Sequence, residues 1–111
     1  MAKLALGVVV ALTILAGEAS ADFMTGNKLI AFCASSKLNE QSGCAGYVEG
    51  VIDYMEWVRL DQHKPQCIPI GTQAPQVADV VLDYLRDHPE MRSYAATDLV
   101  VLAITKAWNC Q

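Results

Sequence analysis

Residues 44–58 read CAGYVEGVIDYMEWV, and this stretch decides the fold class. Its apolar side chains recur every three or four positions, which is the spacing of one face of an α-helix. They are Tyr47, Val48, Val51, Met55 and Val58. We predict a helix that begins near residues 42–44 and ends before the polar run 61–66, where Lys64-Pro65 interrupts the pattern.

The segments on either side show the same periodicity, and no run alternates clearly enough to predict a sheet. Upstream, Thr25 is a good N-cap for a first helix. Downstream, Thr72 is expected to cap a helix that tolerates Pro75 in its first turn and ends by Pro89. The expected helices are therefore about 25–35, 42–60, 73–88 and 93–109. Because short connections join them, we predict an all-α fold, a small up-down bundle with antiparallel neighbours.

The first residues of the chain, MAKLALGVVVALTILAGEASA, have the parts of an export signal. Lys3 precedes an apolar run over residues 4–15, and small residues end in Ala19-Ser20-Ala21, the pattern that signal peptidase cuts. The apolar run is shorter than the about 20 residues of a membrane span. We therefore expect a signal peptide over 1–21, cleavage after Ala21, one domain over 22–111 and a periplasmic location without membrane attachment. An uncleaved anchor is the alternative.

The expected compartment predicts the oxidation state of the cysteines. Four of them, an even number in a short exported chain, indicate two disulfides. In an up-down bundle, Cys33 at the end of the first helix meets Cys44 at the start of the second. Cys67 and Cys110 then lie at the opposite pole. The predicted pairs are Cys33 with Cys44 and Cys67 with Cys110.

The composition and the motifs exclude several functions. The chain has 111 residues and a net charge of -4, and no basic patch, so nucleic acid is not an expected partner. His63 and Cys67 are spaced as zinc ligands, but Pro65 interrupts the segment and no C-x-x-C pair accompanies them. We expect no metal and no cofactor. Without a Ser-His-Asp arrangement or a glycine-rich phosphate loop, we also expect a protein that is not an enzyme.

Three further features lie on the predicted helices. Gly46 and Gly50 are expected to let another helix approach closely. Trp57, at the edge of the apolar stripe, is either the margin of the core or a dimer contact. Acidic residues recur at helical spacing on the second and third helices, and these faces are either solvated or bind a partner. They are Glu49, Asp53 and Glu56, and Asp79, Asp83 and Asp87.

Short motifs along nearly the whole of residues 22–111 resemble the Rap/Tai immunity proteins of type VI secretion systems. They are Thr25-Gly26-Asn27, Cys44-Ala45-Gly46-Tyr47 with Gly50, Cys67-Ile68-Pro69, Tyr84-Leu85 with His88-Pro89-Glu90, and Ala107-Trp108-Asn109-Cys110. One departure is Asn109, which stands where the family usually has proline. The resemblance implies a periplasmic all-α protein, commonly a homodimer, that binds and blocks a peptidoglycan-cleaving amidase effector.

An inhibitor that blocks an enzyme by occlusion needs a protruding element on a rigid scaffold. The best candidate is the connection between the third and fourth helices, residues 87–94, in which Arg92 and Tyr94 are side chains of the hot-spot type. The expected partner-binding residues are Asp87, His88, Glu90, Arg92 and Tyr94. The alternative functions are a periplasmic acid-stress chaperone and an inhibitor of another cell-wall hydrolase such as lysozyme.

Overall fold

A computed structural model describes residues 23–110, which form four α-helices and one short 3-10 helix and contain no β-sheet. The all-α class and the four helices are confirmed. The expected export signal and its cleavage site lie outside the described residues. The helices are α1 (Gly26–Cys33), α2 (Leu38–Asp61), α3 (Ala74–Asp87), η1 (Pro89–Met91) and α4 (Ala96–Ala107). Within residues 23–110, no helix combines the length and the apolarity needed to cross a bilayer.

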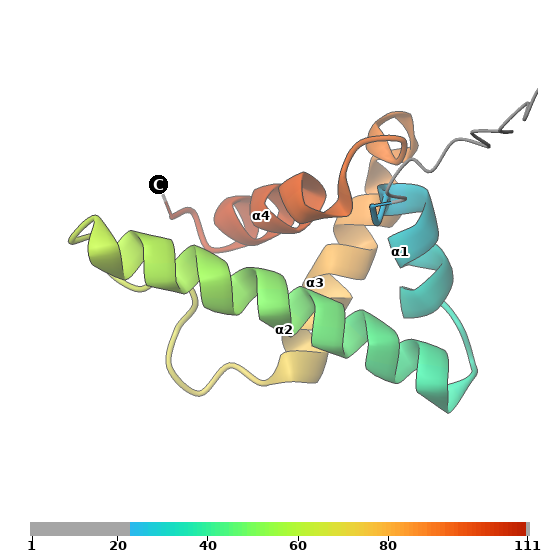
Figure 1. The fold of residues 1–111 in the computed structure, drawn as a ribbon, viewed down its shortest axis with the longest axis horizontal. Coiled ribbons are helices and arrows are strands. Elements are labelled where there is room, and N and C mark those ends of the chain that lie inside the picture. Colours follow the sequence, from blue (N-terminus) through green and yellow to red (C-terminus); the bar gives the residue numbers. More distant parts are fainter. Residues whose placement is uncertain (1–22, 111) are drawn as a thin grey trace, which may run out of the picture.

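The longest helix, α2, is the element around which the others are arranged (Figure 1). α3 crosses behind α2 at a steep angle, and α1 lies beside α3. α4 follows α2 in the same direction. The core lies where the four helices meet. Its fully buried side chains, each worth about 1.5–3 kcal/mol relative to exposure, are Leu29, Val48, Val81, Leu85, Leu99, Val100 and Ile104.

Two disulfides join the ends of these helices. Cys33 at the end of α1 is bonded to Cys44 in α2, with their Cα atoms 5.0 Å apart. Cys67, in the loop after α2, is bonded to Cys110 after α4, with a Cα–Cα distance of 5.4 Å. These are the two pairs that the sequence predicts. Because Cys67 is oxidised, it is not a thiolate ligand for a metal beside His63.

A carboxylate holds the loop that carries this second disulfide. Glu56 Oε1 accepts hydrogen bonds from the backbone N–H groups of Cys67, at 3.0 Å, and Ile68, at 3.3 Å. Glu56 Oε2 lies 3.1 Å from the same Cys67 nitrogen. The sequence placed Glu56 on an acidic helix face, but the structure shows that it fixes the loop between α2 and α3.

Two helix starts differ from the predicted ones. α2 begins at Leu38, earlier than expected, because the Gln41 side-chain amide donates to the Ser35 carbonyl at 2.8 Å and stabilises a first turn that has little apolar character. The N-cap of α3 is Gln73, not Thr72. The Thr72 hydroxyl instead donates to the Pro69 carbonyl at 2.8 Å, so Thr72 closes the preceding turn.

The fourth helix begins at Ala96, not at residue 93, because the backbone before it is paired with another segment. Thr25 and Ala95 form an isolated antiparallel bridge, and the Ala96 N–H donates to the Met24 carbonyl at 2.9 Å. The prediction for Gly46 and Gly50 is also wrong within this chain. A Cβ atom at either glycine would meet no atom within 4 Å, so no other helix approaches there.

Candidate partner-binding site

The connection between α3 and α4 is a compact turn. α3 ends at Asp87, where the His88 N–H still donates to the Tyr84 carbonyl at 3.0 Å. Pro89 has no N–H to extend the helix, and the chain enters η1. The N–H groups of Met91 and Tyr94 then donate to the carbonyls of His88 and Met91, both at 3.0 Å. The backbone of the connection is thus hydrogen-bonded from end to end.

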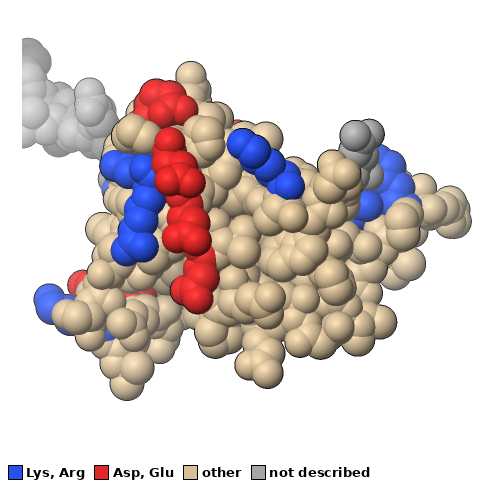
Figure 2. All heavy atoms as spheres, turned by 180° about the vertical axis from the view of Figure 1, so that it is seen from behind, with Lys and Arg blue, Asp and Glu red and all other residues tan. Residues whose placement is uncertain are grey.

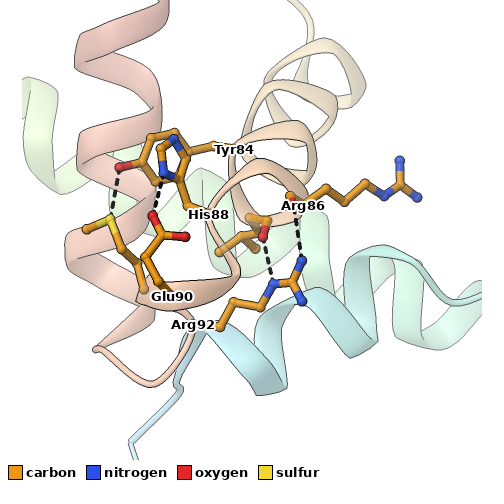
Figure 3. Close-up of polar contacts among 7 residues, drawn as sticks. Tyr84, Arg86, His88, Glu90 and Arg92 are labelled. Atoms are coloured by element: carbon orange, nitrogen blue, oxygen red, sulfur yellow. Dashed lines mark hydrogen bonds and ion pairs between the residues drawn. The ribbon is translucent and has the colours of Figure 1, made fainter.

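Arg92 braces the connection against α3 (Figure 3). Its Nε donates to the Leu85 carbonyl at 2.7 Å, and an Nη donates to the Arg86 carbonyl at 3.2 Å. Carbonyls in the last turn of a helix have no partner within the helix, and a cation there also interacts favourably with the helix dipole. The guanidinium of Arg92 therefore shapes the connection, although the sequence suggested a side chain that reaches a partner.

A second brace comes from His88, whose ring packs on the Tyr84 ring with centroids 4.3 Å apart. His88 Nδ1 lies 3.0 Å from Glu90 Oε1, and the Tyr84 hydroxyl donates to Met91 Sδ at 3.6 Å (Figure 3). The hydrogen bond from His88 lowers the pKa of the Glu90 carboxyl below its ordinary value, aided by the backbone N–H of Glu90 and by the charges of His88 and Arg92.

The start of α1 closes the third side of the connection. The Gly26 N–H donates to the Tyr94 carbonyl at 3.0 Å, and the Asn27 N–H donates to the Arg92 carbonyl at 2.8 Å. The first N–H groups of a helix have no partner within it, so this contact satisfies two of them. A Cβ atom at Gly26 would lie 2.9 Å from Arg92 Cα and 2.5 Å from Leu99 Cδ1. Only glycine fits here without a shift of the backbone.

The outer face of the connection is exposed. The Tyr94 side chain is 59% exposed and lines a hollow of about 370 Å³ together with Leu102 of α4. Glu90 and Asp98 place carboxylates among its lining residues. Of the five predicted partner-binding residues, Asp87, Glu90 and Tyr94 are exposed, whereas His88 and Arg92 are half-buried and bonded within the connection.

Acidic side chains lead along α3 to this connection. Asp79, Asp83 and Asp87 are all exposed, and Figure 2 shows a line of acidic groups on the face that α3 presents, with Lys and Arg side chains beside it. Four-residue spacing places them on one side of the helix. The site therefore combines an exposed aromatic ring with a surface of mixed charge, which is suited to binding a protein with a complementary pattern of charges.

The fold alone does not define a function. Comparison with known families finds a match. The family described as Rap1a immunity proteins matches residues 25–110, a range that contains all four cysteines and the connection. The chain belongs to this family of immunity proteins, which bind cognate effectors and are not enzymes. Neither the curated proteins nor the solved structures compared with the chain gave a match.

Proposed function

We propose that the protein is a periplasmic immunity protein that binds and occludes a peptidoglycan amidase effector of a type VI secretion system. Membership of the Rap1a immunity proteins supports the protective role. Two disulfides in a small domain support an oxidising compartment. In this proposal the signal over residues 1–21 delivers the domain to the periplasm and is cleaved after Ala21.

The braced connection is the proposed inhibitory element, and the hydrogen bonds that hold its backbone are the observation that carries the proposal. Hydrogen bonds from Arg92 to α3 and from α1 to the carbonyls of the connection hold its backbone from two sides. An element ordered before binding loses little conformational freedom when it enters a cleft. Tyr94 and Glu90 contact the effector, and Asp87 extends the acidic surface beside them. His88 and Arg92 act indirectly by holding the shape.

Replacement of one exposed side chain tests this assignment. Tyr94→Ala should weaken binding of the amidase that intoxicates cells lacking this protein by about tenfold or more, because tyrosines at interface centres are frequent hot spots. Ile70→Ala, which removes a side chain that is 93% exposed far from the connection in the sequence, is the matched control. Calorimetry gives the affinity, and release of peptide from peptidoglycan gives the inhibition. Equal affinity for both variants would place the inhibitory surface elsewhere.

We also propose that α2 carries the contact of a homodimer. Trp57 is 59% exposed and stacks on Tyr54, itself 67% exposed, with ring centroids 6.0 Å apart. Leu60, one turn further along, is 73% exposed. Adjacent exposed apolar side chains are costly in water unless another molecule covers them. Sedimentation of the Trp57→Ala protein should show monomers, and an unchanged dimer would remove Trp57 from the contact.

A further inference from the structure

A groove of about 730 Å³ runs between α2 and α4, and none of the residues of the connection lines it. Its volume is within the range of small-molecule sites, about 300–1,000 Å³. The walls are formed mainly by apolar and aromatic side chains, among them Val51, Tyr54, Met55, Val58 and Val101. Contact of such apolar walls with water is unfavourable, so an apolar ligand that covers the walls binds favourably.

The two ends of the groove differ in chemistry. At one end the hydroxyls of Tyr47 and Thr97 are hydrogen-bonded at 3.0 Å, which ties α2 to α4. At the other end are the charged lining residues, Arg59 and Lys64, and no carboxylate lines the groove. Arg59 is buried, and its Nε donates to the Pro65 carbonyl at 3.0 Å. Within residues 23–110 the Lys64 ammonium makes no ion pair, so it is available to an anion, although Lys64 also lines a second hollow together with Asp53 and Glu56.

Two glycines form part of one wall. Gly46 and Gly50 each make α2 less stable than alanine would, by about 1 kcal/mol. A Cβ atom at either position would meet nothing within 4 Å, so packing within the chain does not require glycine there. The absent side chains leave bare backbone and widen the groove along its length. An elongated ligand that lies against this wall would explain why both positions are glycine.

We propose that the groove binds a single-chain amphiphile of the fatty-acid class. The apolar chain lies along the wall of Gly46 and Gly50, and the carboxylate lies beside Lys64. Charge favours this ligand over a cationic one, because both charged residues that line the groove, Arg59 and Lys64, are cationic. This binding site shares no residue with the proposed inhibitory connection, so either of these two proposals can fail without the other, but it shares Tyr54 with the proposed dimer contact.

Laurate, at concentrations where it is monomeric, is the probe. The full chain is expressed with its export signal, purified from the periplasm and titrated by calorimetry. Gly50→Leu places a side chain in the groove at a position where its Cβ atom would meet nothing within 4 Å. It should reduce laurate affinity at least tenfold while the far-ultraviolet circular dichroism is retained. Ser42→Leu, which adds the same side chain at an exposed position of α2 outside the groove, should bind like the wild type.

A charge variant tests the orientation of the ligand. Lys64→Gln should weaken binding of laurate by about fivefold, the upper range for an exposed ion pair, and leave binding of neutral dodecanol unchanged. If Gly50→Leu fails to fold, the comparison of laurate with dodecanol still tests whether the groove binds a fatty acid. The proposal is overturned if laurate does not bind, or if all variants bind it equally. It is also overturned if Gly50→Leu converts a dimer to monomers or abolishes effector binding, because the groove then holds a protein.

Discussion

Gly26→Ala should destabilise the protein although alanine is the better helix former. The added Cβ atom would lie 2.9 Å from both Cα and the carbonyl oxygen of Arg92, and 2.5 Å from Leu99 Cδ1. The leucine methyl can move, but the backbone of Arg92 can yield only by displacing the connection from α1. Overpacking of this kind costs about 1–3 kcal/mol. Gly26 is the first residue of α1, where the propensity gain of alanine is small.

The matched control is the same substitution where the structure leaves space. A Cβ atom at Gly46 or Gly50 meets nothing within 4 Å, and both residues are in the interior of α2. Gly→Ala should therefore stabilise the protein there by about 0.5–1 kcal/mol. One substitution thus has opposite signs at two places in the same small domain, which excludes a general effect on the unfolded chain.

Urea denaturation with the disulfides intact measures both effects. Total stabilities of about 5–15 kcal/mol make a change of 1–3 kcal/mol easy to detect. In a domain of this size, 1 kcal/mol corresponds to a shift of about 4–8 °C in the midpoint of thermal unfolding. If Gly26→Ala were as stable as the wild type, the close approach of α1 to the connection would not exist. The contact with α1 would then not hold the connection, and only the hydrogen bonds of Arg92 to α3 would remain.

Three further predictions concern the polar contacts. Arg92→Ala removes two hydrogen bonds to carbonyls at the end of α3 and should lower the free energy of unfolding by about 1–3 kcal/mol; an unchanged urea midpoint would contradict the brace. Glu56→Gln should speed hydrogen exchange at the Cys67 amide, which donates a hydrogen bond to the carboxylate. The same exchange rate in the variant and the wild type would show that the loop is held by other contacts. The pKa of Glu90 is lower in the folded than in the unfolded protein, so its stabilising contribution is complete above the unfolded pKa and is lost as the pH falls through the folded pKa. Glu90→Gln should therefore lose less stability than the wild type on acidification, and an NMR titration that gives an ordinary pKa for Glu90 would refute this.

The helices could be predicted because their pattern is local. Apolar residues such as Val48 and Val51 recur within a turn or two. The order of the helices predicted the two disulfides correctly, although α3 crosses α2 steeply and does not lie antiparallel to it. The start of α4 could not be predicted this way. Ser93 fits a helical pattern, but the residues around it pair with a segment near Thr25, and no short window of sequence contains both partners.

The sequence predicts where the connection between α3 and α4 lies but not how its side chains are bonded. The sequence indicates that Arg92 and Tyr94 lie in the connection between two helices, yet it does not distinguish an arginine that reaches outward from one that binds the helix before it. The structure shows Arg92 bonded to α3 and Tyr94 exposed. Glu56 was missed for the same reason, because its partner is an amide in a distant loop and not a side chain with a recognisable spacing.

Capture of partners by the tagged protein tests the central claim most directly. The tagged chain is retrieved from the cell envelope at neutral and at acidic pH, together with the Tyr94→Ala variant, and the bound proteins are identified by mass spectrometry. The account predicts one stoichiometric peptidoglycan amidase at neutral pH with the wild type, and its loss with the variant. A broad set of envelope proteins that binds only in acid would contradict the account and identify a chaperone.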